Sequence, residues 1–205
     1  AHELRSPLAA LKVQTDVAQL SQDDPQARER ALAQLHAGID RASRLVDQLL
    51  TLSRLDSLDN LDDVEPITLA DLLQSAVLDI WHPAQQAGID IRLNNHAPQV
   101  KRQGQPLLLS LLVRNLLDNA IRYSPRGSVV DVTLDARSFS VRDNGPGVDP
   151  EVLTRIGERF YRPPGQNATG SGLGLSIVRR IAALHGMRVS LSNAAEGGFE
   201  VKVSW

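Results

Sequence analysis

The sequence predicts a chain in two parts, a helical hairpin followed by an α/β sandwich. The first observation is a heptad-like spacing of apolar residues through residues 1–56, which is typical of helices that pack lengthwise. The second is a change after residue 66 to a mixture of helical and strand-like segments. Several short alternating segments among them predict a mostly antiparallel sheet with helices on one face.

The composition is that of an ordinary globular protein, with 42% apolar and 22% charged residues. The net charge of −2 and an aromatic content of 3% give no basis for binding nucleic acid, so we expect no such partner. The chain contains no cysteine, which excludes disulfides, thiolate metal sites and cysteine nucleophiles. Its longest apolar runs are far shorter than the roughly 20 residues that a membrane span needs.

Two amphipathic helices are predicted in residues 1–56, separated by the stretch "SQDDP". Asp24 can cap the second helix and Pro25 suits its first turn, and so short a connection requires an antiparallel hairpin. Two helices cannot bury their seam fully, so we expect a four-helix bundle made by two chains, although packing against the rest of one chain is the plainer alternative. The seam consists of Leu4, Leu8, Leu11, Thr15 and Ala18 in the first helix and of Leu32, Leu35, Ile39, Ala42, Val46 and Leu49 in the second.

The domain boundaries are expected on either side of the acidic, aperiodic residues 57–66, which have the composition of a linker. This leaves a first domain of residues 1–56 and a second of residues 67–205. The chain begins in helical rhythm without an N-cap residue, so we also expect further chain upstream. In the second domain the patterns predict helices at 69–88, 106–123 and 171–185 and strands at 89–95, 128–134, 138–143, 188–193 and 198–205.

The predicted helix at 106–123 has a polar face opposite its apolar one. With Asn115 as the reference, Asp118, Asn119 and Arg122 fall within about 60 degrees of it on a helical wheel. Amide oxygens are suitable ligands for Mg²⁺ that arrives with substrate phosphates. A plain solvated face explains the same residues, so this pattern alone is weak evidence for a magnesium site.

A second polar cluster follows the predicted strand at 138–143, where "DNGPGV" places Gly145 and Gly147 after Asp143. An ordinary turn is one interpretation of this stretch. In the other, Asp143 accepts a hydrogen bond from a ligand amine while the glycines let the backbone approach that ligand. The breaker-rich residues 159–170 that follow have the length and composition of a lid.

A third glycine-rich stretch, "TGSGLGLSIV", directly precedes a predicted helix. Backbone N–H groups at such a helix start can face an anionic phosphate. No lysine follows the glycines, so this is not a Walker A loop, and no strand directly precedes them, as a dinucleotide-binding fingerprint requires.

Taken in order, these stretches resemble the motifs of the bacterial sensor histidine kinases over essentially all 205 residues. The resemblance rests on "HELRSPL", "NLLDNAIRYS", "DNGPGV", "ERFYR" and "GSGLGLSIV". It implies that the helical hairpin is a dimerisation and phosphoacceptor domain. The second domain is similar to the GHKL-type (Bergerat) ATP-binding sandwich shared with gyrase, Hsp90 and MutL.

The resemblance implies ATP and Mg²⁺ as ligands and assigns roles residue by residue. His2 would be the phosphoacceptor and Glu3 its general base, while Asn115 and Asn119 would hold Mg²⁺ and phosphate oxygens. The other histidines, His36, His82, His96 and His185, do not stand in any of these motifs and are interpreted as structural. The other residues implied at the nucleotide are Arg122, Tyr123, Asp143, Gly145, Gly147, Phe160, Arg162, Gly170, Gly172, Leu173 and Gly174.

Two positions depart from the family pattern. Ser6 stands where the family commonly has Thr or Asn to position a water for removing phosphate from the partner, and a hydroxyl can still do so. Phosphatase activity is therefore left open. Gly157 stands where the family usually has a phenylalanine, which predicts a looser base of the lid.

The partners implied by the resemblance are a second copy of the chain and a response regulator receiver domain, which is expected to dock on the hairpin near residues 41–55 and the first helix. A plain solvated face explains the row of Arg41, Arg44, Gln48 and Thr51 equally well. A membrane is implied only through upstream segments, which would place this part on the cytoplasmic side of the bacterial inner membrane. Two alternatives remain. A free-standing ATPase of the same superfamily would place a glutamate at position 115, where this chain has Asn115, and an inactive nucleotide-binding dimer scaffold would lack the chemistry.

Overall fold

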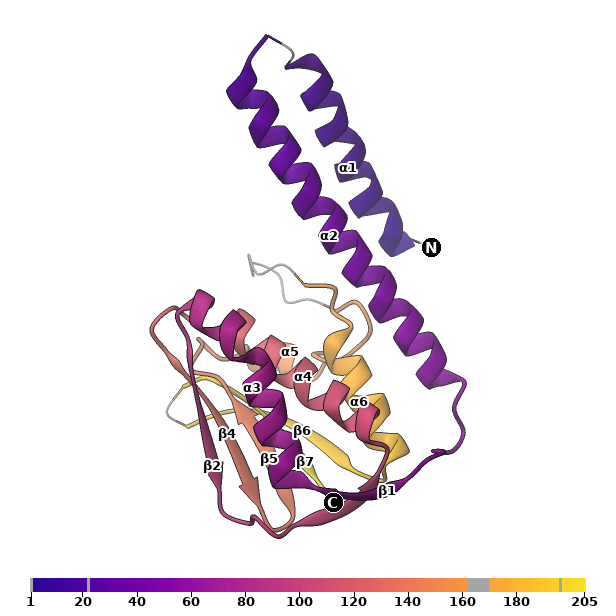
Figure 1. Ribbon diagram of the computed structural model, residues 1–205, viewed down its shortest axis with the longest axis vertical. Helices are drawn as coiled ribbons and strands as arrows, with labels where there is room; N and C mark the ends of the chain where they lie inside the picture. The colour runs from indigo at the N-terminus through magenta and orange to yellow at the C-terminus, as the bar shows by residue number, and fades with distance from the viewer. Residues whose placement is uncertain (1, 22, 162–169, 196) are drawn as a thin grey trace. The chain divides into compact units, whose positions relative to one another are not determined.

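The computed structural model describes residues 2–21, 23–161, 170–195 and 197–205, with side chains from Arg5 onward. The chain divides into two compact units, Ala1–Thr51 and Leu52–Trp205. The first unit is a helical hairpin and the second is a sandwich of helices and a sheet (Figure 1).

The hairpin consists of α1 (His2–Leu20) and α2 (Pro25–Asp56). Asp24 caps α2 as predicted, because its Oδ1 accepts hydrogen bonds from the N–H groups of Gln26 at 3.1 Å and Ala27 at 3.0 Å. The helices approach closely at Gly38, where a Cβ atom would lie only 2.7 Å from Leu11 Cδ2.

Much of the apolar seam of the hairpin is open to solvent in a single chain. Ile39 is 45% exposed and Leu8 is 59% exposed, although both lie at predicted seam positions. Burying these side chains would release a substantial hydrophobic free energy. The other large apolar residues exposed on the two helices are Val13, Val17, Leu20, Leu32, Val46 and Leu50.

The second unit contains a five-stranded sheet of order β2-β4-β5-β7-β6. The pairing of β2 with β4 is parallel and the other three pairings are antiparallel, so the predicted mostly antiparallel sheet is confirmed. The strands are β2 (Asp90–Asn95), β4 (Val129–Asp135), β5 (Ser138–Arg142), β6 (Arg188–Asn193) and β7 (Phe199–Ser204).

Three helices cover one face of this sheet, namely α3 (Leu69–Ala87), α4 (Pro106–Tyr123) and α6 (Gly174–Leu184) (Figure 1). Alternate residues of β4 point into the core that they form, where Val130, Val132 and Leu134 are fully buried. Among the described helices, none has both the length and the apolarity needed to cross a membrane.

Three features of the second unit differ from the predicted elements. A small antiparallel sheet of β1 (Glu65–Thr68) and β3 (Lys101–Gly104) and a single turn, α5 (Pro150–Leu153), were not predicted, because four-residue segments carry too little periodicity. The start of α6 was also predicted too early. The helix begins at Gly174 rather than at residue 171 because Gly172 has a φ of 73°, which a right-handed helix excludes.

Candidate functional site

The two asparagines of α4 meet the start of α6. Asn115 is only 9% exposed, and its Nδ2 donates a hydrogen bond to the Leu111 carbonyl at 2.8 Å, which leaves Oδ1 for another partner. A Cβ atom on Gly174 would lie 3.3 Å from Asn115 Oδ1 and 3.3 Å from Asn119 Nδ2. Both amides therefore lie against the N-terminal turn of α6, where unpaired backbone N–H groups favour an anion.

The last turn of α4 faces the first glycine of the "GSGLG" stretch. A Cβ atom on Gly170 would lie 3.0 Å from Arg122 Nη1 and 3.7 Å from the Tyr123 hydroxyl oxygen. A phenol and a guanidinium, a group that binds phosphate oxygens well, thus stand beside this backbone. Residues that are 47 to 48 positions apart in the sequence are brought together here by the packing of α4 against α6.

Asp143 lies at the end of β5 and is only 5% exposed. Its Oδ1 accepts hydrogen bonds from the N–H groups of Gly145 at 2.8 Å and Phe199 at 3.0 Å. Among the described residues, none is seen to donate to Oδ2, so one carboxylate oxygen is held rigidly and the other is available. A buried carboxylate with one oxygen available can accept a hydrogen bond from a ligand amine.

The pKa of Asp143 is raised, chiefly because burial disfavours its charged form. The N–H groups of Gly145 and Phe199 and the charge of Arg142 oppose this rise. A buried carboxyl with a raised pKa beside a glycine-lined backbone is typical of a binding site rather than of a structural ion pair.

The backbone of Phe160 lies directly against the second glycine of the "GSGLG" stretch. Phe160 N–H donates to the Gly172 carbonyl at 3.2 Å, and a Cβ atom on Gly172 would lie 2.8 Å from the Phe160 carbonyl carbon. Only glycine fits there, both for lack of space and because of the positive φ. Leu173 is fully buried, and its N–H donates to Ser171 Oγ at 3.1 Å. Arg162 lies outside the described residues.

The segment before Phe160 is held by α6 rather than being loose. Arg179 Nη2 donates to the Ile156 carbonyl at 3.1 Å, and Ser176 Oγ donates to the Gly157 carbonyl at 3.3 Å. A Cβ atom on Gly157 would lie 2.8 Å from the guanidinium carbon of Arg179. The arginine thus occupies the space next to Gly157, so the looser lid base expected from this departure is not seen in the described segment.

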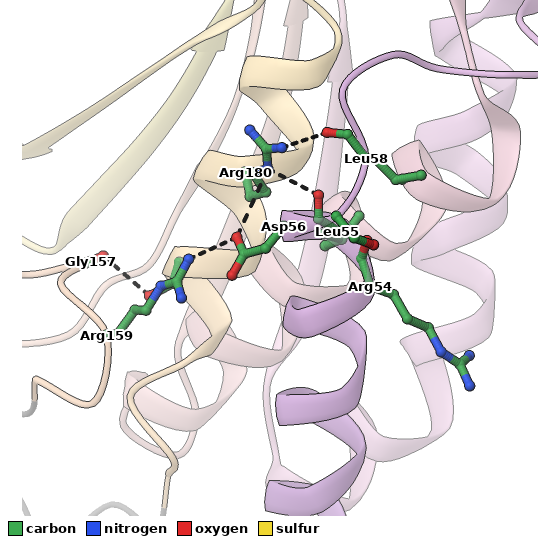
Figure 2. A network of polar contacts seen from close by, with 9 residues as sticks. Arg54, Leu55, Asp56, Leu58, Gly157, Arg159 and Arg180 are labelled. Atoms are coloured by element: carbon green, nitrogen blue, oxygen red, sulfur yellow. Dashed lines mark hydrogen bonds and ion pairs between the residues drawn. The ribbon is translucent and has the colours of Figure 1, made fainter.

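Arg180 of α6 holds the end of α2, which belongs to the second unit (Figure 2). Its Nε donates to the Leu55 carbonyl at 3.1 Å and its Nη2 to the Leu58 carbonyl at 2.6 Å. Asp56 Oδ1 accepts from Arg159 Nη2 at 2.8 Å and lies 4.0 Å from Arg180 Nε. No sequence motif pointed to this network.

His185 connects the end of α6 to the beginning of α4. Its Nε2 accepts from Gln105 N–H at 3.0 Å, and its Nδ1, 2.8 Å from the Ile181 carbonyl oxygen, donates to it in the tautomer that this pairing requires. Gln105 in turn caps α4 by accepting from Leu108 N–H at 2.7 Å. Burial lowers the pKa of His185, against the opposite effect of its bond to Ile181. A structural histidine was expected, and the hydrogen bond accepted by Nε2 requires the neutral form of the ring.

The residues expected to carry the phosphoryl group lie in the other unit. His2 and Glu3 are in the first turn of α1, but their side chains lie outside the described part of the structure. Ser6, one turn further on, is exposed.

The α4 asparagines fit a magnesium ion that is brought in by a ligand. The described residues contain no group of three or more His, Cys, Asp and Glu that could hold a metal by themselves. Mg²⁺ is commonly held through substrate phosphates and only one or two protein oxygens. The amide oxygens of Asn115 and Asn119, both facing the start of α6, meet that requirement.

Two protein families match the chain, one in each part. Residues 1–58 match the family described as "His Kinase A (phospho-acceptor) domain". Residues 104–205 match the family described as "Histidine kinase-, DNA gyrase B-, and HSP90-like ATPase". The order of these families is the one that the motifs predicted.

Sensor protein QseC of Salmonella typhimurium is 80% identical over 205 residues, which are 100% of this chain and 46% of that protein. Sensor protein QseC of Escherichia coli K12 is 78% identical over the same shares. Sensor protein kinase PmrB of Pseudomonas aeruginosa is 41% identical and is matched over 43% of its length. The chain thus spans about half the length of the curated relatives it matches, with 46% for the QseC proteins.

Solved structures agree with the sequence comparisons. The cytoplasmic segment of histidine kinase QseC is 64% identical, with a TM-score of 0.60, and the match covers 82% of this chain and 93% of that one. Full-length ShkA in complex with AMPPNP is 28% identical, with a TM-score of 0.73 and a coverage of 98% and 43%. The predicted fold class and the resemblance to sensor histidine kinases, QseC in particular, are confirmed.

Proposed function

Since the chain belongs to the sensor histidine kinases, we propose that it uses Mg²⁺ and ATP to phosphorylate His2 and then passes the phosphoryl group to an aspartate of a response regulator. Residues 1–56 would form the dimerisation and phosphoacceptor domain, residues 57–66 a linker, and residues 67–205 the ATP-binding domain. The observation that carries this proposal is the convergence of Asn115 and Asn119 on the start of α6.

Adenine would be recognised by Asp143. Its Oδ1 is occupied by two backbone N–H groups, so Oδ2 would accept a hydrogen bond from the exocyclic amine of the base. Gly145 and Gly147 let the backbone lie along the ring. A nucleotide analogue, AMPPNP, is bound by the related kinase ShkA, which supports the same class of ligand here.

The phosphates would lie between α4 and α6. Backbone N–H groups at the start of α6 and the Arg122 guanidinium would face their oxygens, with Tyr123 beside Gly170. Asn115 and Asn119 would hold a magnesium ion, which supplies neutralisation of phosphate charge when bound. Phe160, Gly172 and the segment on to Arg162 would form the base of the lid over the triphosphate.

The transfer needs a free imidazole nitrogen and an acceptor for its proton. A lone pair on the His2 ring would attack the γ-phosphorus while the bond to the β,γ-bridging oxygen breaks, and ADP leaves. Glu3 would accept the proton from the other ring nitrogen. In the second reaction the phosphorus–nitrogen bond breaks and a regulator carboxylate takes the phosphoryl group, so His2 is regenerated.

The hairpin would provide the protein partners. The exposed apolar seam of α1 and α2, including Leu8 and Ile39, supports a homodimer joined as a four-helix bundle. A receiver domain would dock near residues 41–55, and exposed Ser6 would orient the water for phosphatase activity. By family resemblance, the chain would act on the cytoplasmic side of the bacterial inner membrane.

Labelling with γ-³²P-ATP and Mg²⁺ tests the proposal. The wild type should acquire acid-labile, base-stable label, His2→Gln should acquire none, and the matched control His36→Gln, at an exposed position of α2, should label normally. Label that persists in His2→Gln contradicts the assignment of the acceptor.

The alternatives give other outcomes in the same assay. Phosphate release without protein label would indicate a free-standing ATPase, and neither label nor release would indicate an inactive scaffold. Against the ATPase, Asn115 stands where a water-activating glutamate is needed, and an amide does not act as a general base at neutral pH. Its Nδ2 is moreover committed to the Leu111 carbonyl.

A further inference from the structure

The loop that follows β5, residues 143–148, is held at both of its ends by one hairpin. The beginning is held by Phe199, whose N–H donates to Asp143 Oδ1 at 3.0 Å and whose carbonyl accepts from Asp143 N–H at 3.0 Å. The neighbouring Gly198 has a φ of 93°, and any Cβ atom there would overlap the Asp143 carbonyl oxygen. The β6–β7 hairpin therefore lies in direct backbone contact with Asp143.

The end of the same loop is held by Asn193, the last residue of β6. Its Oδ1 accepts from Val148 N–H at 2.8 Å, and its Nδ2 donates to the Val148 carbonyl at 2.6 Å. One side-chain amide thus pairs with both backbone groups of one residue, as a neighbouring strand would. A Cβ atom on Gly147 would lie 3.0 Å from Asn193 Oδ1, so the glycine is needed for this approach.

The two attachments are one structural unit, because Asn193 and Phe199 are directly paired across the hairpin. A single rung of the β6–β7 ladder therefore sets the distance between the two ends of the loop. The residues between the ends include Gly145 and Gly147, which the proposed function places along the adenine ring. Glycine-rich backbone has high conformational entropy when it is free, so attachment at both ends is needed to preorganise it.

We infer that Asn193 is a positioning residue for the adenine end of the nucleotide site, acting through the loop of residues 143–148. It contacts the loop backbone at Val148 and leaves base recognition to Asp143. This inference rests on the proposed function, because it assumes that the loop lies along an adenine ring. Asn193 is itself solvent-exposed, so its contribution to overall stability is small compared with its effect on the loop.

Calorimetric titration of the full chain tests the inference. Asn193→Ala should bind Mg²⁺-AMPPNP roughly fivefold more weakly, the factor that one net hydrogen bond contributes. Adenosine affinity should fall by the same factor, whereas affinity for Mg²⁺-tripolyphosphate should not change, because the phosphates lie at α4 and α6. In labelling kinetics the KM for ATP should rise with little change in kcat.

Three comparisons make the result decisive. Asn193→Asp keeps the acceptor for Val148 N–H but sets a carboxylate against the Val148 carbonyl, so it should bind at least as weakly as Asn193→Ala. Ser192→Ala, at the adjacent exposed residue of β6, should bind like the wild type. Amide hydrogen exchange at Val148 should be faster in Asn193→Ala, while the melting temperature stays close to that of the wild type.

Equal adenosine affinity in the wild type and Asn193→Ala would overturn the inference, and so would an equal loss of tripolyphosphate binding. Failure of the proposed function is distinguishable, because in that case the wild type itself would bind neither adenosine nor Mg²⁺-AMPPNP.

Discussion

Nη2 of Arg159 lies 2.8 Å from Oδ1 of Asp56, although 103 residues separate them in the sequence. The pair connects the segment next to Phe160 with the last turn of α2, and Arg180 of α6 lies beside it (Figure 2). Arg159 and Asp56 are both substantially exposed, so their ion pair is the weaker part of this network. The stronger part is the capping of the Leu55 and Leu58 carbonyls by Arg180.

Replacing Arg180 should therefore cost more stability than replacing Arg159. We expect Arg180→Ala to lose about 2 kcal/mol, because two backbone carbonyls lose a charged donor. Arg159→Ala should lose less than about 1 kcal/mol. Urea unfolding followed by tryptophan fluorescence measures this for the second unit, since both tryptophans, Trp81 and Trp205, lie there.

Arg188→Ala, at an exposed position of β6, serves as the matched control and should unfold like the wild type. Equal losses for Arg180→Ala and Arg159→Ala would show that the ion pair, and not the capping of the carbonyls, dominates this network.

Asp143→Asn should separate stability from nucleotide binding. An asparagine Oδ1 can accept the same two bonds from Gly145 and Phe199 while the buried charge is removed. Burial raises the pKa of Asp143, so the stability that goes with its protonated form is present below the unfolded pKa and is lost as pH rises through the folded pKa. At pH 7 the variant should be at least as stable as the wild type.

The same variant should bind Mg²⁺-AMPPNP about 10- to 100-fold more weakly, because an amide NH₂ opposes the adenine amine where a charged acceptor stood. In the wild type, affinity should decline as pH falls toward the raised pKa of Asp143, since a protonated carboxyl is a poorer acceptor. A variant that keeps wild-type affinity would remove Asp143 from base recognition.

His185 should make stability depend on pH. Its Nε2 must be unprotonated to accept from Gln105 N–H, and burial lowers its pKa. The stability it contributes is present above the unfolded pKa of about 6.5 and is lost as pH falls through the lower folded pKa. Urea midpoints at pH 7.5 and 5.5 should fall more for the wild type than for His185→Gln.

His36→Gln, at an exposed site of α2, is the matched control and should show the wild-type slope. An identical slope in His185→Gln would mean that the link between α6 and α4 tolerates protonation.

Gly174→Ala should preserve the fold and weaken nucleotide binding. Alanine favours a helix over glycine by about 1 kcal/mol, so urea stability should not fall. The added Cβ would lie 3.3 Å from Asn115 Oδ1 and 3.3 Å from Asn119 Nδ2, so it should displace the amides. We expect Mg²⁺-AMPPNP affinity to fall by about tenfold, because small misplacements of positioning groups are costly. Unchanged affinity together with unchanged stability would show that these amides are not used by the ligand.

Most of the fold could be predicted because its signals are local. The apolar spacing of α4 marked a helix with one buried face, and the alternation in β4 marked a half-buried strand. The cap at Asp24 is likewise a property of neighbouring residues. The pair β1 and β3 escaped prediction because each strand is short and is stabilised mainly by its distant partner.

The candidate site was predicted only in part: the motif residues were found from the sequence, whereas the residues that hold them in place were not. Asn115, Asp143 and Gly174 stand in motifs whose residue types and spacing indicate their chemistry. Asn193 stands in no such motif, and neither does Arg180. An asparagine at the end of a strand and an arginine on a helix are too common to mark a function.

The sequence by itself determined which residues are candidates for binding a nucleotide, because amides, a carboxylate and glycines at fixed spacing are local and chemically distinctive. Only the tertiary structure decided what holds them in place: Asn193 on Val148, His185 on Gln105, and Arg180 on Leu55 and Leu58. The physical reason is that each of these side chains binds backbone N–H or C=O groups. Nearly every residue carries such groups, so no pattern of residue types can reveal which of them will be the partner.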